Sequence, residues 1–384
     1  MKHYFLHRFI TVTMRIAIGW IVKRVMGYKC AIYKGPDVPT LIIANHNSDI
    51  DPAFVAMGIT RQTYFLASEH SFRAGFPSKI MKAAFAPIPI NKTVTDVSAI
   101  KEMMRRLKAG ANVCLFAEGN RSFSGKTAPI GISAAKLAKR SGADLMTFRI
   151  EGGYFTTPRW AGKKRKGEMT GAVVNVYAAA DLKGMTDEQV LDAIERDIHE
   201  DAYELQKERQ IRYRGKNLAE NIETALYLCP GCKGIGTIAS KGDSFSCGCG
   251  LSGIYTETGF LEGESLPFST ITEWCEWQKA EMEVIAKGAG GGTICSDAGQ
   301  RLYAVRAAVD KTLVGEGEMR IDRETFHCAG FDFPLDQIIS FAVAGQMTLL
   351  FALKSGTVYD IRSTIPRSAL KYRDLFRILT GRGE

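Results

Sequence analysis

A histidine and an aspartate stand five positions apart in the segment NHNSDID, residues 45–51, directly after the apolar run Leu41–Ala44. Histidine can accept a proton from an alcohol near neutral pH, because its ordinary pKa is about 6.5. Such a base needs an acceptor on its second ring nitrogen, which leaves the nitrogen facing the alcohol unprotonated. We therefore predict that His46 is a general base and that Asp51 orients it.

A second polar segment, FAEGNRS, residues 116–122, follows the apolar run Val113–Leu115. Arg121 offers a forked and permanently charged set of donors, which suits a phosphate group. Gly119 lets the backbone come close to a ligand. The alternative interpretation is a turn in which Glu118 and Arg121 form a surface ion pair.

In this order and about seventy residues apart, the two segments resemble the signature of the glycerolipid acyltransferases, in particular the lysophosphatidate (1-acylglycerol-3-phosphate) acyltransferase family. The resemblance covers about residues 30–180, a little under half the chain. It implies that His46 and Asp51 are catalytic. It also implies that Glu118, Gly119 and Arg121 bind the phosphate of the acceptor.

The chain departs from the family pattern at several positions. The family usually carries proline and threonine where this chain has Ala117 and Asn120. In the segment PIPINK, Lys92 stands where the family generally has arginine, so we expect a phosphate contact that keeps the charge and loses the bidentate fork. The best match to the family's fourth motif, Leu145–Gly153, lacks the usual proline, and we assign it no chemistry.

The resemblance implies an acyltransferase of phospholipid synthesis. The acyl group would pass from the thioester of acyl-coenzyme A or acyl carrier protein to the free hydroxyl of lysophosphatidate or a related lysophospholipid. Direct transfer of this kind requires no catalytic metal. The alternatives are another acceptor, such as glycerol 3-phosphate or a non-phosphate lysolipid, and a non-catalytic lipid-binding adaptor.

The residues of the first segment allow two further interpretations. Asp51 precedes Pro52, and an aspartate followed by a proline is a favourable helix start, so Asp51 could cap a helix over Pro52–Gly58. Asp49 and Asp51 could also be a pair of metal ligands. We favour the catalytic pair, because the second segment follows where the resembled family has it.

The net charge of +9 favours anionic partners, such as acidic lipid headgroups, coenzyme A or acyl carrier protein. No RNA-recognition or helix-turn-helix pattern is present, so we expect no nucleic acid. Residues 1–28 are rich in apolar side chains, yet the longest clean run, Ile16–Val22, is shorter than the ~20 residues that span a bilayer. We expect an interfacial helix on anionic lipid at the cytoplasmic face of the membrane, peripheral or monotopic. The alternative is a helix packed on the domain's own core.

The length of 384 residues predicts two or three domains. Short apolar runs alternate with helical stretches between residues 29 and 180, which predicts an α/β acyltransferase domain over 29–215. We expect one long charged helix over Asp187–Tyr213. A further helix is expected over Lys216–Leu228.

Two cysteine pairs follow in residues 216–262, the part predicted to hold a helix and a zinc ribbon. Cys229 and Cys232, with Cys247 and Cys249, offer four thiolates on tight turns, which fits a tetrahedral structural zinc site. Free thiols or a redox pair are the alternatives, since the second pair has one intervening residue instead of two.

The last part, residues 263–384, is predicted to be a linker helix and a β-rich domain. A helix near Ile271–Lys287 precedes the glycine-rich break Gly288–Gly292. Short strand patterns continue from Arg301, and a helix over Arg367–Leu379 closes the chain. Strands followed by one helix resemble a pleckstrin-homology-like module.

Overall fold

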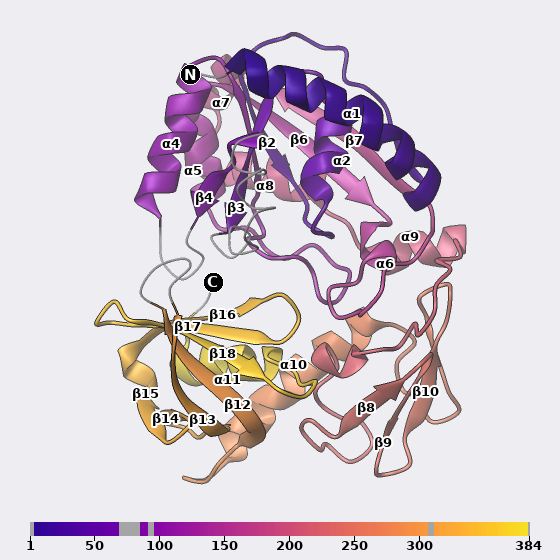
Figure 1. Ribbon diagram of the computed structural model, residues 1–384, viewed down its shortest axis with the longest axis vertical. Helices are drawn as coiled ribbons and strands as arrows, with labels where there is room; N and C mark the ends of the chain where they lie inside the picture. Colours follow the sequence, from indigo (N-terminus) through magenta and orange to yellow (C-terminus); the bar gives the residue numbers. More distant parts are fainter. Residues whose placement is uncertain (1–3, 69–84, 91–95, 306–310, 383–384) are drawn as a thin grey trace. The chain divides into compact units, whose positions relative to one another are not determined.

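The computed structural model describes residues 4–68, 85–90, 96–305 and 311–382. The chain divides into two compact units (Figure 1). The first comprises residues 1–91, 96–159 and 164–214, and the second comprises residues 92–95, 160–163 and 215–384.

Within the described residues, the first unit is built on a seven-stranded mixed sheet with the order β1-β7-β6-β2-β5-β3-β4. Strand β7 runs antiparallel to β6, and every other neighbouring pair is parallel. The α/β prediction is therefore confirmed. The strands are β1 (Tyr28–Cys30), β2 (Thr40–Ala44), β3 (Thr63–Ser68), β4 (Ile88–Ile90), β5 (Asn112–Phe116), β6 (Asp144–Glu151) and β7 (Met169–Tyr177).

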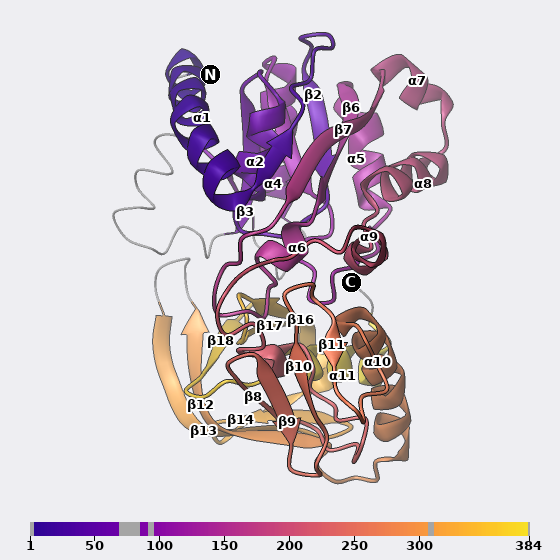
Figure 2. The ribbon, with the colours of Figure 1, turned by 90° about the vertical axis from the view of Figure 1, so that its right-hand side faces the viewer.

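Helices cover both faces of this sheet (Figure 2). The central strand β2 shows why: Leu41 and Ile43 pack into one core, whereas Ile42 and Ala44 pack into the other. A parallel strand that is buried on both faces has a continuous run of apolar residues in its sequence. The first face carries α4 (Val97–Lys108), α5 (Ser133–Ser141), α7 (Ala179–Gly184) and α8 (Asp187–Ile198), and the second carries α1 (Tyr4–Met26) and α2 (Asp51–Gly58).

Helix α1 packs on the domain with one side and exposes large apolar side chains on another. Val22 is buried in the core with α2, and His7 Nδ1 lies 3.1 Å from the hydroxyl of Tyr64. Phe5, Phe9 and Trp20 are largely exposed, at 83%, 67% and 66%. In the part of the chain that the structure describes, no helix combines the length and apolar character needed to cross a membrane.

The single helix predicted over residues 187–213 is wrong, because the chain breaks after α8 and restarts as α9 (Ala202–Arg209). Asp201 caps α9, since its side chain accepts hydrogen bonds from the amides of Tyr203 and Glu204. An aspartate at a helix start satisfies backbone donors that a continuous helix would have paired itself. The break turns Glu200 into the interior, where it is 3% exposed.

The second unit begins with a small antiparallel sheet in the order β11-β10-β9-β8. The helix predicted over residues 216–228 is wrong: this stretch consists of turns and the 3₁₀ helix η2 (Ile222–Thr224). Its amides have partners outside a helix, because Leu218 donates to Asp243 and Asn221 donates to Ser240. The strands are β8 (Ile238–Lys241), β9 (Ser244–Cys247), β10 (Ser252–Tyr255) and β11 (Leu261–Glu262).

The predicted C-terminal β-rich domain is confirmed. Helix α10 (Ile271–Gly288) precedes an antiparallel sheet with the order β15-β14-β13-β12-β18-β17-β16, and α11 (Leu370–Thr380) follows it. Phe326 and Phe351 stack edge to face inside this sheet. The likeness to a pleckstrin-homology module stays a prediction. The strands are β12 (Cys295–Val305), β13 (Lys311–Ile321), β14 (Thr325–Cys328), β15 (Phe331–Pro334), β16 (Ile338–Ala344), β17 (Thr348–Leu353) and β18 (Val358–Ser363).

Candidate active site

The two polar segments of the sequence meet at one edge of the first unit's sheet. Strands β2 and β5 are parallel neighbours, and their last residues, Ala44 and Phe116, are partners in the register. The first motif loop (residues 45–50) and the second motif loop (residues 117–132) therefore leave the sheet side by side. Open α/β sheets place ligand sites at this carboxyl edge.

His46 and Asp51 form the predicted pair. The Nδ1 of His46 lies 2.9 Å from Asp51 Oδ2. The same carboxylate oxygen accepts hydrogen bonds from the amides of Asn47 and Ser48, at 2.7 and 2.9 Å. Since an oxygen that receives these amides is an acceptor, Nδ1 is the ring nitrogen that carries the proton in the neutral imidazole, and Nε2 then keeps its lone pair.

The imidazole of His46 is held on its face as well as at its edge. It stacks on Phe116 with the ring centroids 4.4 Å apart, and its side chain is 19% exposed. Its backbone is fixed too, because Ser122 donates an amide hydrogen bond to the carbonyl of His46 at 3.1 Å. In its neutral form, an oriented and partly exposed imidazole of this kind can remove a proton from a hydroxyl group through Nε2.

The two other interpretations of Asp51 find no support in its contacts. Ile50 precedes α2 without a side-chain cap, and the fully buried Asp51 carboxylate turns back to the loop instead. Asp49 is 80% exposed and pairs with Arg121. Among the described residues, the one group of three or more side chains that could hold a metal ion consists of cysteines in the second unit.

Glu118 does not face solvent, because its side chain is 5% exposed. One carboxylate oxygen accepts from the amide of His46 at 2.6 Å, and the other accepts from the amide of Ala128 at 2.8 Å. Gly119 has φ +68°, and an added Cβ would meet no atom within 4 Å. The turn therefore requires glycine for its left-handed backbone, and open space lies beside it.

Arg121 lies against the first motif loop. Its Nε is 3.2 Å from Asp49 Oδ1, and its side chain is 13% exposed. Its backbone carbonyl accepts a hydrogen bond from Arg159. Lys92, the other predicted phosphate contact, lies outside the described residues.

The sequence analysis missed Glu200, which the break between α8 and α9 brings to the first motif loop. Its Oε2 accepts from the amides of the Asn45 and Asn47 side chains, at 3.0 and 2.5 Å. Its Oε1 accepts from the backbone amide of Gly152 at 3.0 Å. The available signal was Asp201, a helix-capping residue inside a stretch of helical periodicity.

Burial raises the pKa of Glu118 and that of Glu200 to about 8 each, although amide donors favour their charged forms. The folded chain then holds protons that the unfolded chain releases at a lower pH. These two carboxyls therefore lower the free energy of unfolding as the pH rises from the ordinary carboxyl range towards 8.

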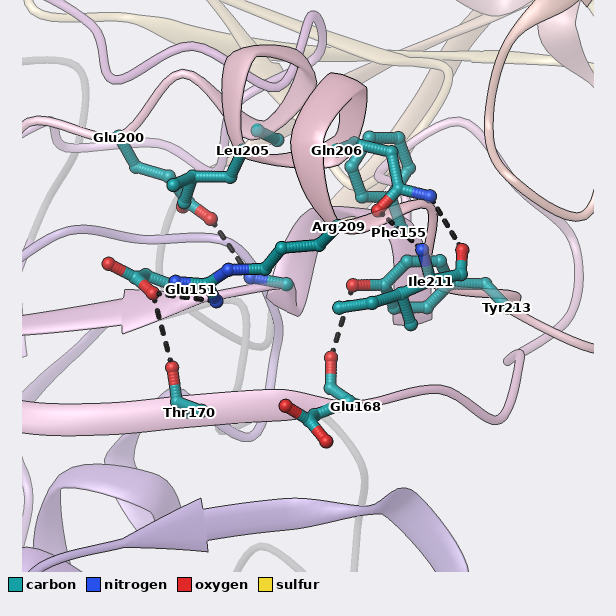
Figure 3. Close-up of a pocket in the computed structure, with 12 residues that line it drawn as sticks. Glu151, Phe155, Glu168, Thr170, Glu200, Leu205, Gln206, Arg209, Ile211 and Tyr213 are labelled. Carbon is teal, nitrogen blue, oxygen red and sulfur yellow. Dashed lines mark hydrogen bonds and ion pairs between the residues drawn. The ribbon is translucent and has the colours of Figure 1, made fainter.

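Glu200 also lines a small cavity beside α9, together with Glu151 and Arg209 (Figure 3). The cavity has a volume of about 10 Å³, which is room for about one water molecule. It is far too small for a substrate, and His46 is not among the residues that line it.

The four predicted metal-ligating cysteines lie together in the second unit. The Sγ atoms of Cys229 and Cys249 are 3.6 Å apart, those of Cys232 and Cys247 are 3.7 Å apart, and all four lie within 4.8 Å of one another. A tetrahedron with metal–sulfur bonds of about 2.3 Å has edges of about 3.8 Å. The cluster could therefore hold a metal ion.

Among solved structures, the chain is similar to the crystal structure of the 1-acyl-sn-glycerophosphate (LPA) acyltransferase, PlsC, from Thermotoga maritima, with 18% identity and a TM-score of 0.42 over 54% of this chain and 81% of that chain. Residues 31–151 match the family model described as acyltransferase. This stretch includes both motif loops, and Glu200 lies beyond it. The first unit of the chain therefore contains an acyltransferase domain.

Proposed function

We propose that the chain is an acyltransferase that moves a fatty acyl group from a thioester donor to the free hydroxyl of lysophosphatidate or a related lysophospholipid. One observation carries the proposal: Asp51 holds the Nδ1 of a partly exposed His46, inside a domain of the acyltransferase family. The donor is the thioester of coenzyme A or of acyl carrier protein.

The proposed reaction is a direct transfer. His46 Nε2 takes the proton of the acceptor hydroxyl while its oxygen attacks the thioester carbonyl carbon. The carbon–sulfur bond then breaks, and the proton passes from His46 to the departing thiolate. The products are an ester and a free thiol, and the histidine returns to its starting state. Asp51 stabilises the imidazolium that forms between the two steps.

A product analysis tests the function directly. Purified protein would be offered acyl-coenzyme A or acyl-acyl carrier protein, together with a panel of lysolipids and glycerol 3-phosphate, and the products would be identified by mass spectrometry. We expect a diacylated product carrying a phosphate. Transfer to glycerol 3-phosphate alone, or no transfer to any acceptor, would contradict the proposal.

Arg121 is proposed to bind the acceptor phosphate, with Lys92 as a second contact. The ion pair with Asp49 implies a competition, because a phosphate must share Arg121 with that carboxylate or displace it. Replacing Arg121 with alanine should raise the KM for a phosphate-bearing acceptor by about 10- to 100-fold, since a charged hydrogen bond contributes about 1.5–3 kcal/mol. The KM of Arg121→Lys should lie between those of the native protein and of Arg121→Ala, because the fork is lost and the charge is kept.

The matched control is Asp49→Asn, which removes the competing charge and keeps the side-chain size. It should lower the KM for the same acceptor. Steady-state kinetics would measure both variants, with a lysolipid that lacks phosphate as the reference acceptor. Equal losses on both kinds of acceptor would remove Arg121 from the phosphate site.

We further propose that α1 binds an anionic membrane surface at the cytoplasmic face. At 3.6 residues per turn, Phe5, Phe9 and Trp20 fall within a sector of roughly 60° on the helix. Lys23 and Arg24 in the last turn are exposed as well. An apolar stripe with basic residues beside it suits insertion between lipid headgroups.

Replacing Phe5, Phe9 and Trp20 with serine should reduce binding to anionic vesicles several-fold, and added salt should weaken binding of the native protein. Vesicle sedimentation measures both effects. The control is Val97→Ser with Ile100→Ser, since these residues are also exposed and apolar but lie on α4. Equal binding by the two sets of variants would place α1 away from the lipid.

The metal of the cysteine cluster is proposed to be zinc. Four sulfur ligands with tetrahedral spacing suit zinc, and the absence of a position for water or substrate is typical of a structural site. Its proposed role is to hold the turns of the small sheet in the second unit.

A further inference from the structure

Glu200 contacts both motif loops of the candidate active site, although it lies 49 residues beyond the family match. Its side chain holds the first motif loop through Asn45 and Asn47, the residues on either side of His46. Its backbone holds the second motif loop, because Thr127 donates its amide to the carbonyl of Glu200 at 2.9 Å and accepts from the Glu200 amide at 2.9 Å.

Besides Glu200, the two asparagine side chains bond to the backbone of Ile150. The Asn47 side chain has one other hydrogen bond, to the carbonyl of Ile150 at 3.2 Å, among those that the described residues provide. Asn45 also pairs with the backbone of Ile150. All of these groups are buried, so a lost acceptor would leave amide donors without water to replace it.

We propose, on the basis of the function proposed above, that Glu200 is a positioning residue for the catalytic base. It acts through Asn45 and Asn47 to hold His46 between them in the conformation in which Nδ1 faces Asp51. The carboxyl oxygens of Glu200 act as hydrogen-bond acceptors in this role, because each donor that reaches them in the described chain is an uncharged amide. A shift of about 1 Å in a reacting group can cost 10²-fold in rate.

Replacing Glu200 with alanine should lower kcat by about 10- to 100-fold and leave the KM for the acceptor nearly unchanged, since Arg121 does not contact Glu200. Glu200→Gln should restore part of the loss, because its carbonyl oxygen can still accept from both asparagines, although its NH2 group cannot accept from the amide of Gly152. The matched control is Asp197→Asn. Asp197 is equally buried and accepts from Thr147 and Tyr177, away from the motif loops, so it should lower thermal stability without lowering kcat.

A double-mutant cycle distinguishes positioning from general destabilisation. If Glu200 acts through Asn47, the variant that combines Glu200→Ala with Asn47→Ala should lose less than the product of the two single losses in kcat. Multiplicative losses, or a Glu200→Ala loss no larger than that of Asp197→Asn, would overturn the proposal. If Glu200→Ala does not fold, Asn47→Ala removes the same contact from the other side, and an unchanged kcat would again overturn it.

Nitrogen NMR of the histidine rings gives a readout that does not depend on activity. In the native protein, His46 should be the Nδ1–H tautomer. The Glu200→Ala variant should show a mixture of tautomers, whereas Asp197→Asn should not. If the native protein transfers no acyl group but this shift is seen, the proposed function fails and the positioning role stands. If transfer occurs but neither the tautomer nor kcat changes in Glu200→Ala, the positioning role fails alone.

Discussion

Replacing His46 with alanine is expected to reduce acyl transfer by about 10²–10⁴-fold or more, the range typical for loss of a general base. No base is then left at the position of Nε2 to take the proton of the acceptor hydroxyl as the hydroxyl attacks. Asp51→Asn should cost a large part of the same factor, because an amide in place of the carboxylate no longer enforces the Nδ1–H tautomer. Steady-state kcat/KM with the acceptor and donor found by product analysis measures both.

The structure adds a distinction between these two variants. His46 is partly exposed, whereas Asp51 is fully buried and accepts from the amides of Asn47 and Ser48 as well as from His46. Asp51→Asn should therefore also lower the thermal midpoint, and His46→Ala should do so much less. His7→Ala is the control for removal of a histidine elsewhere in the unit. Near-normal turnover in His46→Ala would exclude the proposed mechanism.

Much of the first unit could be predicted from local sequence. Apolar runs identified the strands around Leu41–Ala44, Val113–Leu115 and Leu145–Gly153 to within a few residues, because a strand buried on both faces needs apolar side chains throughout. The pairing of His46 with Asp51 was also predictable, since the two are five residues apart and one turn brings them together.

The parts that failed depend on partners far along the chain. In the sequence, Glu200 resembles any other acidic residue of a charged helix. Its proposed role depends on its hydrogen bond with Asn47, which lies 153 positions away. The stretch 216–228 has helical periodicity, yet its amides bond to Asp243, Ser240 and Gln278. Such tertiary contacts override local propensity, and they leave no periodic signal in the sequence.

Glu118 illustrates an intermediate case. Its place in the second motif loop was predicted, but the direction of its carboxylate was not. The side chain turns inward and accepts from the backbone amide of His46, whereas Glu200 accepts from the asparagines on either side of His46 in the sequence. An acidic residue beside a glycine turn gives no indication of which way it points. Its role as a direct substrate ligand remains a prediction.

Removal of the metal is expected to have the second large effect, on the fold of the second unit. The protein should contain one zinc per chain, and chelation or Cys232→Ser should abolish that stoichiometry. Structural zinc in small domains contributes roughly 10–16 kcal/mol of apparent binding energy. Hydrogen exchange should therefore accelerate first around residues 225–260.

The neighbouring contacts set how far this loosening spreads. The turn before Cys229 is anchored to α10, because Trp274 Nε1 donates to the carbonyl of Leu228 at 2.9 Å and Gln278 accepts from the amide of Tyr227. The Cys247–Cys249 turn follows β9, whose main apolar anchor is Phe245 against Trp274. We therefore expect β9 and its turn to open before the segment around Tyr227.

Cys275→Ser is the control for this experiment, because Cys275 is a buried thiol of α10 that lies outside the cluster. It should keep one zinc per chain and normal exchange in β9. Acyl transfer should survive zinc removal at least in part, since His46 and Arg121 belong to the other unit. Protein purified without any metal, yet with residues 225–260 protected, would refute the zinc site. Complete loss of transfer on chelation, with the first unit still folded, would instead mean that the cysteine cluster supports the active site.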